Sequence, residues 1–273
     1  MQVMRVMHSF DRETALARLD ERTFTGIVAP GWSVGRGANG GFVAALLLRA
    51  LAAMPEAEGR DARSLTIHYL APAEDGPVRI VTAVERAGRT LATLSARMTQ
   101  DEKPVAVALA AFARSRTSIE LADAVMPDTP PPEAVAMLDT AALGMPRYAE
   151  QYDYRWAVGD APFSRSAHAV VGGWMRLREP RAVDAPLAAA YLDGWIPCLY
   201  PRLDAPVAAP TIDLTIHFRR PLPLPDIPPD EYCLVVFRAR LASNGFFDEE
   251  GELWSRDGRL LAQSRQLVLL PAD

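Results

Sequence analysis

The chain has few of the residues that form disulfides, metal sites or nucleic-acid surfaces. Its 273 residues include only two cysteines and four histidines, and no Cys, His, Asp or Glu group has the spacing of metal ligands. Cys198 and Cys233 are far apart, so we interpret both as small buried hydrophobic residues. The net charge of −5 lacks the basic surplus of a general nucleic-acid binder. These absences leave an ordinary globular protein that acts on something other than nucleic acid.

Long apolar runs are also absent. No window approaches the roughly 18 apolar residues of a membrane span, and residues 1–8 lack the hydrophobic core of a signal peptide. We therefore predict a cytoplasmic protein whose partners include neither a membrane nor nucleic acid. With 49% apolar residues, the chain is long enough for two domains that each have a core.

One short block of sequence occurs twice. Residues 64–69 read SLTIHY and residues 213–218 read DLTIHF, and a proline follows each block at the same offset, Pro72 and Pro221. The displacement is 149 residues, and a second pair of similar segments, 98–106 and 254–262, follows at a displacement of 156. Repeats of this size are whole small domains. The chain is therefore predicted to be an internal duplication, with the additional residues in a Pro-rich loop at 221–229.

The first copy combines an enclosed helix with a run of strands. Residues 39–54 begin at a capping asparagine, Asn39, and Pro55 follows them directly. Their body is apolar nearly all the way round, which is typical of a helix that is covered on every side. The pattern then changes to alternation at 64–69 and in three further runs, at 77–86, 90–100 and 104–114, joined by hairpin-length connections.

The second copy has the same pattern. We expect strands near 152–158 and 168–177, a helix over 184–199 that is capped by Asp184, and an antiparallel meander over 211–270. Residues 116–150 are rich in proline and show only weak helical patterning at 132–143, which indicates a linker. An antiparallel sheet wrapped around a central helix is the hotdog architecture. The sequence thus predicts an α+β double hotdog, with units at 1–115 and 151–273 and the linker at 116–150.

Two motifs in one loop suggest other functions. Residues 31–35, GWSVG, match the nucleophile elbow of serine hydrolases, and residues 35–40, GRGANG, match a dinucleotide-binding pattern. The elbow needs a direct turn from strand to helix, but a glycine-rich loop follows Ser33. The dinucleotide pattern needs a preceding buried strand, which Pro30 and Gly31 interrupt. We favour the simpler interpretation that these glycines let a loop approach the start of the helix closely.

Several further segments match one protein family in their order and spacing. In the first copy these are Asn39-Gly40-Gly41-Phe42 at the helix start, the block from residue 64 to Pro72, RAGRT at 86–90, and Gln100 with Lys103-Pro104. In the second copy they are YLD at 191–193, TID at 211–213 with FRRP at 218–221, and Asp257-Gly258 to Ala262 with Gln266. Over residues 20–115 and 184–270 they resemble the acyl-CoA thioesterase II family, whose members have a tandem hotdog fold. The chain departs from that family at His217 and Leu267.

The resemblance implies hydrolysis of an acyl-CoA, or a similar acyl thioester, to a free acid and a thiol. It implies catalytic roles for Asp193, which would activate a water molecule, and for Thr211 and Gln266, which would hold that water. No cofactor is expected apart from the CoA of the substrate. The expected partner is the small-molecule acyl thioester, with a homodimer as the candidate assembly.

Physical arguments test the three residues separately. Asp193 is the only acidic or basic residue between Asp184 and Arg202, and a carboxylate on an enclosed helix is costly unless it is paired or used. Burial would raise its pKa toward that of a general base. Alternation in the last strand directs Gln266 toward the helix, whereas strict alternation directs Thr211 away from it. Thr211 can face the site only if the first residue of its strand departs from the pattern.

The start of the first helix is the expected substrate-binding element. Asn39, Gly40 and Gly41 place free backbone N–H groups and the positive end of the helix dipole where no Cβ intervenes. A carbonyl oxygen that gains negative charge would be stabilised there, and simple helix capping is the alternative interpretation.

Two other functions stay open on the sequence alone. One is an acyl-CoA-binding protein that lacks catalysis, and the other is a hydratase or dehydratase on the same fold. The latter would usually need a histidine on a central helix, and neither predicted helix contains one.

Overall fold

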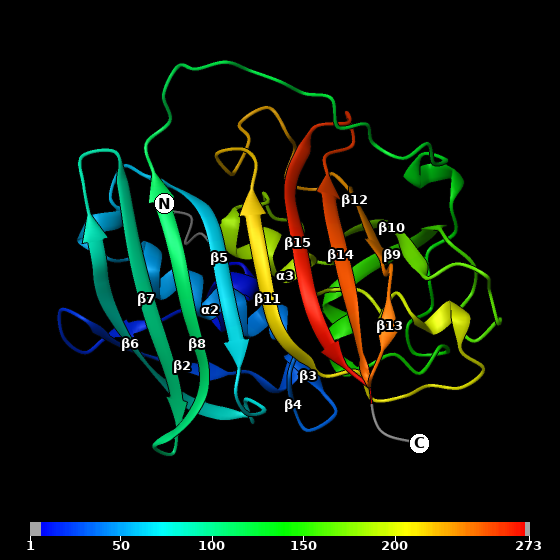
Figure 1. The fold of residues 1–273 in the computed structure, drawn as a ribbon, viewed down its shortest axis with the longest axis horizontal. Helices are drawn as coiled ribbons and strands as arrows, with labels where there is room; N and C mark the ends of the chain where they lie inside the picture. The colour runs from blue at the N-terminus through cyan, green and yellow to red at the C-terminus, as the bar shows by residue number, and fades with distance from the viewer. Residues whose placement is uncertain (1–6, 271–273) are drawn as a thin grey trace, which may run out of the picture.

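A 13-stranded antiparallel sheet curves around two central helices (Figure 1). The structure, a computed structural model, describes residues 7–270. The first half supplies strands β1 (Ala17–Arg18), β2 (Thr23–Val28), β5 (Asp61–Tyr69), β6 (Gly76–Ala87), β7 (Leu91–Gln100) and β8 (Lys103–Ala113). The second half supplies β9 (Tyr152–Val158), β10 (Val170–Leu177), β11 (Thr211–Phe218), β12 (Cys233–Arg238), β13 (Ala242–Ser243), β14 (Phe246–Trp254) and β15 (Leu260–Leu269).

The strands follow the order β1-β2-β6-β7-β8-β5-β11-β15-β14-β12-β10-β9, and β13 pairs with β14. Helices α2 (Gly40–Ala52) and α3 (Ala185–Tyr191) lie on the concave face of this sheet, one in each half (Figure 1). The structure also has a short helix, α1 (Ser9–Glu13), and a two-stranded sheet, β3 (Ser33–Val34) with β4 (Gly37–Ala38). Five 3-10 turns complete the described elements: Pro30–Trp32, Pro55–Ala57, Pro132–Ala134, Arg147–Gln151 and Tyr200–Arg202. The predicted double hotdog is confirmed.

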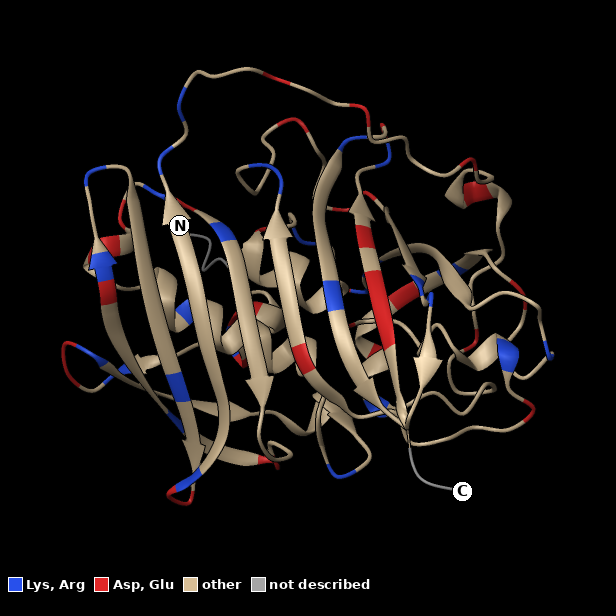
Figure 2. Cartoon of the chain, in the orientation of Figure 1, with Lys and Arg blue, Asp and Glu red and all other residues tan. Residues whose placement is uncertain are grey.

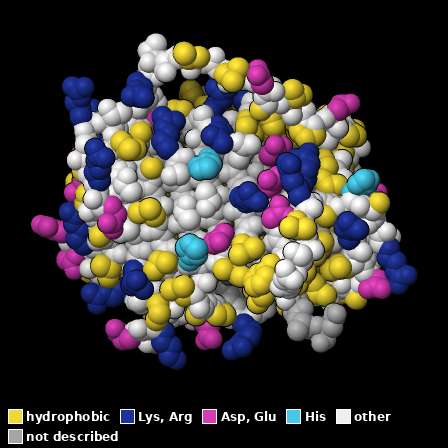
Figure 3. All heavy atoms as spheres, in the orientation of Figure 1, with side chains coloured by type: hydrophobic (Ala, Val, Ile, Leu, Met, Phe, Trp, Pro, Cys, Tyr) yellow, Lys and Arg dark blue, Asp and Glu magenta, His cyan; other side chains and the backbone are white. Residues whose placement is uncertain are grey.

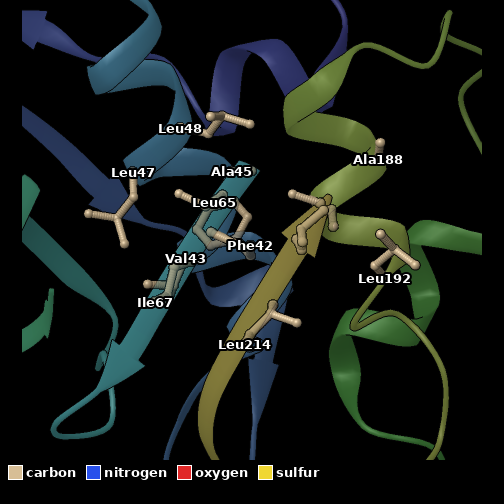
Figure 4. Close-up of a cluster of buried hydrophobic side chains, with 14 of the residues drawn as sticks. Phe42, Val43, Ala45, Leu47, Leu48, Leu65, Ile67, Ala188, Leu192 and Leu214 are labelled. Carbon is tan, nitrogen blue, oxygen red and sulfur yellow. The ribbon is translucent and has the colours of Figure 1, made fainter. Parts of the chain in front are cut away.

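Helix α2 forms where the sequence predicts it. The side chain of Asn39 accepts a hydrogen bond from the Phe42 N–H, which caps the first turn. Ten of its 13 residues are buried, in agreement with the apolar pattern all round the helix. Side chains from α2, α3 and the two middle strands interdigitate in one core (Figure 4), which includes Phe42, Val43, Leu65, Ile67, Ala188, Leu192 and Leu214.

The two copies join at the centre of the sheet, where β5 pairs with β11. Thr66 lies opposite Thr215, and their hydroxyl oxygens are 3.1 Å apart. Both threonines occupy the same position of the repeated block, so an approximate twofold axis passes between them. The outer face of these strands carries His68 and His217, both exposed. Figure 3 shows histidine side chains near the middle of this face, with acidic and basic side chains gathered to their right and along the edges.

The second half departs from the prediction in two places. The helix predicted over 184–199 ends at Tyr191, because Gly194 weakens a helix and Pro197 has no N–H to continue one. In the segment between β8 and β9, the weak helical pattern at 132–143 yields only the 3-10 turn Pro132–Ala134. The boundaries of the units and linker stay a prediction.

Candidate active site

Directly after α3, four consecutive backbone carbonyl groups each accept a hydrogen bond from a different side chain. A helix end exposes carbonyls that have no partner within the helix. Here the donors are Gln266 Nε2 to Leu192 (3.3 Å), Asn39 Nδ2 to Asp193 (2.7 Å), the Tyr154 hydroxyl to Gly194 (2.6 Å) and the Tyr148 hydroxyl to Trp195 (3.2 Å). These bonds fix the backbone on both sides of Asp193.

The Asp193 carboxylate lies against the start of α2. Its Oδ2 accepts hydrogen bonds from Asn39 Nδ2 at 2.9 Å and from the Gly41 N–H at 2.8 Å. A Cβ on Gly41 would lie 2.8 Å from the Ala190 carbonyl oxygen, and one on Gly40 would lie 3.0 Å from Asp193 Oδ2. Gly41 therefore has to be glycine if the two helices are to approach this closely, and at Gly40 a Cβ would make a tight contact with the Asp193 side chain.

The environment of Asp193 suits a general base. Asp193 remains partly exposed, yet burial raises its pKa to about 6, against the opposing effect of the hydrogen bonds from Gly41 and Asn39. A base with a pKa near the working pH is both ionised and able to take a proton. Asp193 can therefore exchange a proton near neutral pH.

A β-bulge turns Thr211 inward, onto Gln266. On β15, Val268 pairs with Thr211 and Leu267 pairs with Asp213, so Ile212 is the extra residue in β11. A bulge reverses which residues face inward, and the expectation from strict alternation is therefore wrong at Thr211. The Thr211 hydroxyl donates to Gln266 Oε1 at 2.8 Å, and Gln266 is almost completely buried, as its alternation predicts.

Two residues at this site were missed from the sequence. Tyr69 donates its hydroxyl hydrogen to the Gly40 carbonyl at 2.8 Å, and its repeat counterpart, Phe218, has no hydroxyl. That difference within a repeated block was a usable signal. Glu249, on β14, is a buried carboxylate that pairs with Gln266 on β15. In the sequence, Glu249 lies within the acidic segment 248–252, and acidic segments of this kind usually face solvent.

Only one of the two equivalent positions in the duplication carries these polar groups. Counted from the helix caps, Asp193 corresponds to Leu48, and strand pairing makes Ala62 and Ala110 the counterparts of Thr211 and Gln266. The bulge recurs between Ala62 and Ser64. An open cavity of about 180 Å³ lies at this second position, between the end of α2 and the start of α3, and Leu48 and Ala62 line it.

Ser33 lies outside this site. It belongs to the antiparallel pair β3 and β4, and its hydroxyl donates to the Pro30 carbonyl at 3.1 Å. Among residues 7–270, no three His, Cys, Asp or Glu side chains are grouped as metal ligands. No helix in the same range is long and apolar enough to cross a membrane.

Replacement of Ser33 by alanine should leave any hydrolytic activity within about threefold of the parent, because no nucleophile elbow surrounds this serine. The measurement is the rate of thiol release from an acyl-CoA ester, together with fluorophosphonate labelling followed by mass spectrometry. Stoichiometric labelling at Ser33 would contradict this expectation.

The fold and its polar site define a class, the thioester hydrolases with a tandem hotdog fold. Residues 28–113 match the model of the acyl-CoA thioesterase N-terminal domain, and residues 123–270 match that of the C-terminal domain. The chain belongs to the acyl-CoA thioesterase family, as the resemblance of its motifs predicted.

Similar proteins cover nearly the whole chain. A hotdog protein of unknown function from Alicyclobacillus acidocaldarius is 34% identical, with a TM-score of 0.90 over 98% of this chain and 100% of the other. A putative thioesterase II from Thermobifida fusca YX is 27% identical, with a TM-score of 0.83 over 98% and 99%. An uncharacterized protein of Mycobacterium tuberculosis is 24% identical over an alignment of 286 positions that covers 92% of this chain and 92% of the other.

Proposed function

We propose that this protein hydrolyses an acyl-CoA or similar acyl thioester with a water molecule that Asp193 activates. The observation that carries the proposal is the placement of Asp193. Its carboxylate is held by Asn39 and Gly41, remains partly exposed and has a pKa raised to about 6. The pair formed by Thr211 and Gln266 lies beside it.

The hydrogen bonds of that pair orient the water. Thr211 gives its hydroxyl hydrogen to Gln266 Oε1, so the Thr211 oxygen is left as an acceptor. A water molecule between Thr211 and Asp193 would donate one hydrogen to each of them. Its lone pair would then face the thioester carbon, which is the arrangement that attack requires.

The reaction proceeds without an enzyme-bound intermediate. Asp193 takes a proton from the water as the oxygen bonds to the thioester carbon, and the carbonyl oxygen gains negative charge. We place that oxygen beside Asn39, Gly40 and Gly41, where the positive end of the α2 dipole stabilises it. The Gly41 N–H already donates to Asp193, so it would have to be shared. The C–S bond then breaks, and the thiolate takes the proton from Asp193. No cofactor is required.

The test is release of free thiol from a panel of acyl-CoA esters by the purified protein. Thiol release that increases with enzyme concentration supports hydrolysis. Binding without thiol release would favour the acyl-CoA-binding alternative. Hydration or dehydration of the acyl chain with the thioester intact would favour a hydratase or dehydratase.

Activity should fall as pH decreases through about 6, because Asp193 must be ionised to accept a proton and its pKa lies near that value. The raised pKa means that protonation begins well above the usual carboxyl range. The measurement is kcat/KM against pH at constant ionic strength. A rate that stays level down to the ordinary aspartate pKa, about 4, would contradict the assignment of Asp193 as the base.

A further inference from the structure

Glu249 is a buried carboxylate that the proposed reaction does not use. It points inward from β14, directly opposite Gln266 on β15, and is 7% exposed. Its Oε2 accepts the Cys198 N–H at 2.7 Å, and its Oε1 lies 3.4 Å from Gln266 Nε2, which donates to it. Glu249 therefore contacts both the segment that follows Asp193 and the amide that bonds to Thr211.

The Gln266 amide has a hydrogen-bond donor, Nε2, on one side and an acceptor, Oε1, on the other. Its Nε2 faces the Leu192 carbonyl and the Glu249 carboxylate, which are both acceptors when Glu249 is ionised. Its Oε1 consequently faces the Thr211 hydroxyl. A hydroxyl can donate or accept, so Thr211 cannot set this direction by itself. The Leu192 carbonyl favours it, and an ionised carboxylate, which is the stronger acceptor, enforces it.

We infer that Glu249 is a positioning residue: its carboxylate holds the Gln266 amide in one orientation, which makes Thr211 a donor to Gln266 and an acceptor for the attacking water. This inference rests on the proposed function, because it assigns a role in the orientation of the same water. Glu249 acts through Gln266 and Thr211 and touches no reacting atom.

The duplication supports this role independently. In the half without Asp193, Ala110 occupies the place of Gln266 and pairs with Leu94, which occupies the place of Glu249. The carboxylate is thus present only in the half that has the polar site. Leu94 shows that an apolar residue fills this strand position well, and a buried carboxylate is costly in comparison. Packing alone gives no reason for an acid here.

The groups around Glu249 determine when its carboxylate is ionised. Burial raises the pKa of Glu249 to about 7, against the bonds from Cys198, and the charges of Asp193 and Asp248 raise it further. A protonated Glu249 carries a hydrogen on one of its two oxygens, and each of these oxygens faces an N–H donor, from Cys198 or from Gln266. The arrangement is therefore complete only when Glu249 is ionised as well as Asp193, so the fall in activity begins near the Glu249 pKa of about 7 and steepens below the Asp193 pKa of about 6.

The test is Glu249→Gln, compared with Glu250→Gln as a matched control. A glutamine at 249 can accept from only one of the two donors, and its NH2 group must face the other. Glu250 is the next residue of the acidic strand β14 (Figure 2), on the opposite face, where it pairs with Arg240 at 3.0 Å. We expect kcat to fall about tenfold or more in Glu249→Gln, with KM within about threefold, and both constants to be unchanged in Glu250→Gln.

Two further measurements separate positioning from a merely structural role. In a Thr211→Val background, Glu249→Gln should have little additional effect on kcat, because residues that act through one water are not additive. In the parent protein, the acid limb of log(kcat/KM) against pH should have a slope of about two, and in Glu249→Gln a slope of about one. The parent slope needs no variant, so the inference stays testable if Glu249→Gln fails to fold.

The possible failures can be told apart. A parent protein that releases no thiol from any ester would overturn the proposed function and this inference together. An active parent with a slope of about one, or a Glu249→Gln variant whose kcat equals that of Glu250→Gln, would overturn the role of Glu249 alone. Fully additive losses with Thr211→Val would also overturn it.

Discussion

Asp193→Asn is expected to reduce kcat by about 10² to 10⁴-fold, the usual contribution of general-base catalysis. Asparagine keeps the size of the side chain, and its oxygen can still accept from Asn39 and Gly41. It cannot take a proton from water. The measurement is steady-state thiol release at saturating substrate, with Asp184→Asn as the control, because Asp184 caps the same helix and asparagine caps equally well.

The stability of the same variant distinguishes a chemical role from a structural one. The Asp193 pKa is raised in the folded protein from 3.8 to about 6, so folding favours the protonated form. That stability is present below pH 3.8 and is lost as pH rises through about 6. Above this window Asp193→Asn should melt at the same temperature as the parent or higher. Unchanged turnover, or a variant that simply unfolds, would contradict the catalytic assignment.

Gly41→Ala is expected to damage both folding and catalysis. The new Cβ would lie 2.8 Å from the Ala190 carbonyl oxygen and 3.0 Å from Asn39 Oδ1, so α2 and α3 must move apart. Overpacking of this kind costs about 1–3 kcal/mol of unfolding free energy. The Gly41 N–H would shift away from Asp193, and a misplacement near the reacting groups lowers kcat by about 10-fold or more.

Gly88→Ala is the matched control, because the nearest atom to its Cβ would be the Leu91 carbonyl oxygen at 3.4 Å. Both variants are compared by urea denaturation and by thiol release. If Gly41→Ala retained the stability and kcat of Gly88→Ala, then the close approach of the two helices would not be required for the site.

The duplication made most of the fold predictable. A repeated block fixes the order of the two units, and alternation identifies strands whose two faces meet different surroundings. The end of α3 was less predictable, because Leu, Tyr and Trp continue an apolar pattern beyond the last helical residue. Only Gly194 and Pro197 mark the true end.

The site residues were predictable to different degrees. Asp193 stands out because it is an isolated charge among apolar residues, and Gln266 because alternation places it inside. The inward orientation of Thr211 depends on a bulge at Ile212, which no glycine or proline signals. Glu249 faces inward while its neighbour Glu250 faces outward, and a run of acids conceals that difference.

The hydrogen bonds from Asn39 and Gly41 to Asp193 join residues that are more than 150 positions apart in the chain. The proposed base belongs to the second copy, and the groups that hold it belong to the first. During synthesis the ribosome completes the first copy well before Asp193 is made, and domains generally fold in that order. A nascent or half-folded chain therefore lacks the assembled site, so under the proposed mechanism hydrolysis begins only after the second copy has docked on the first.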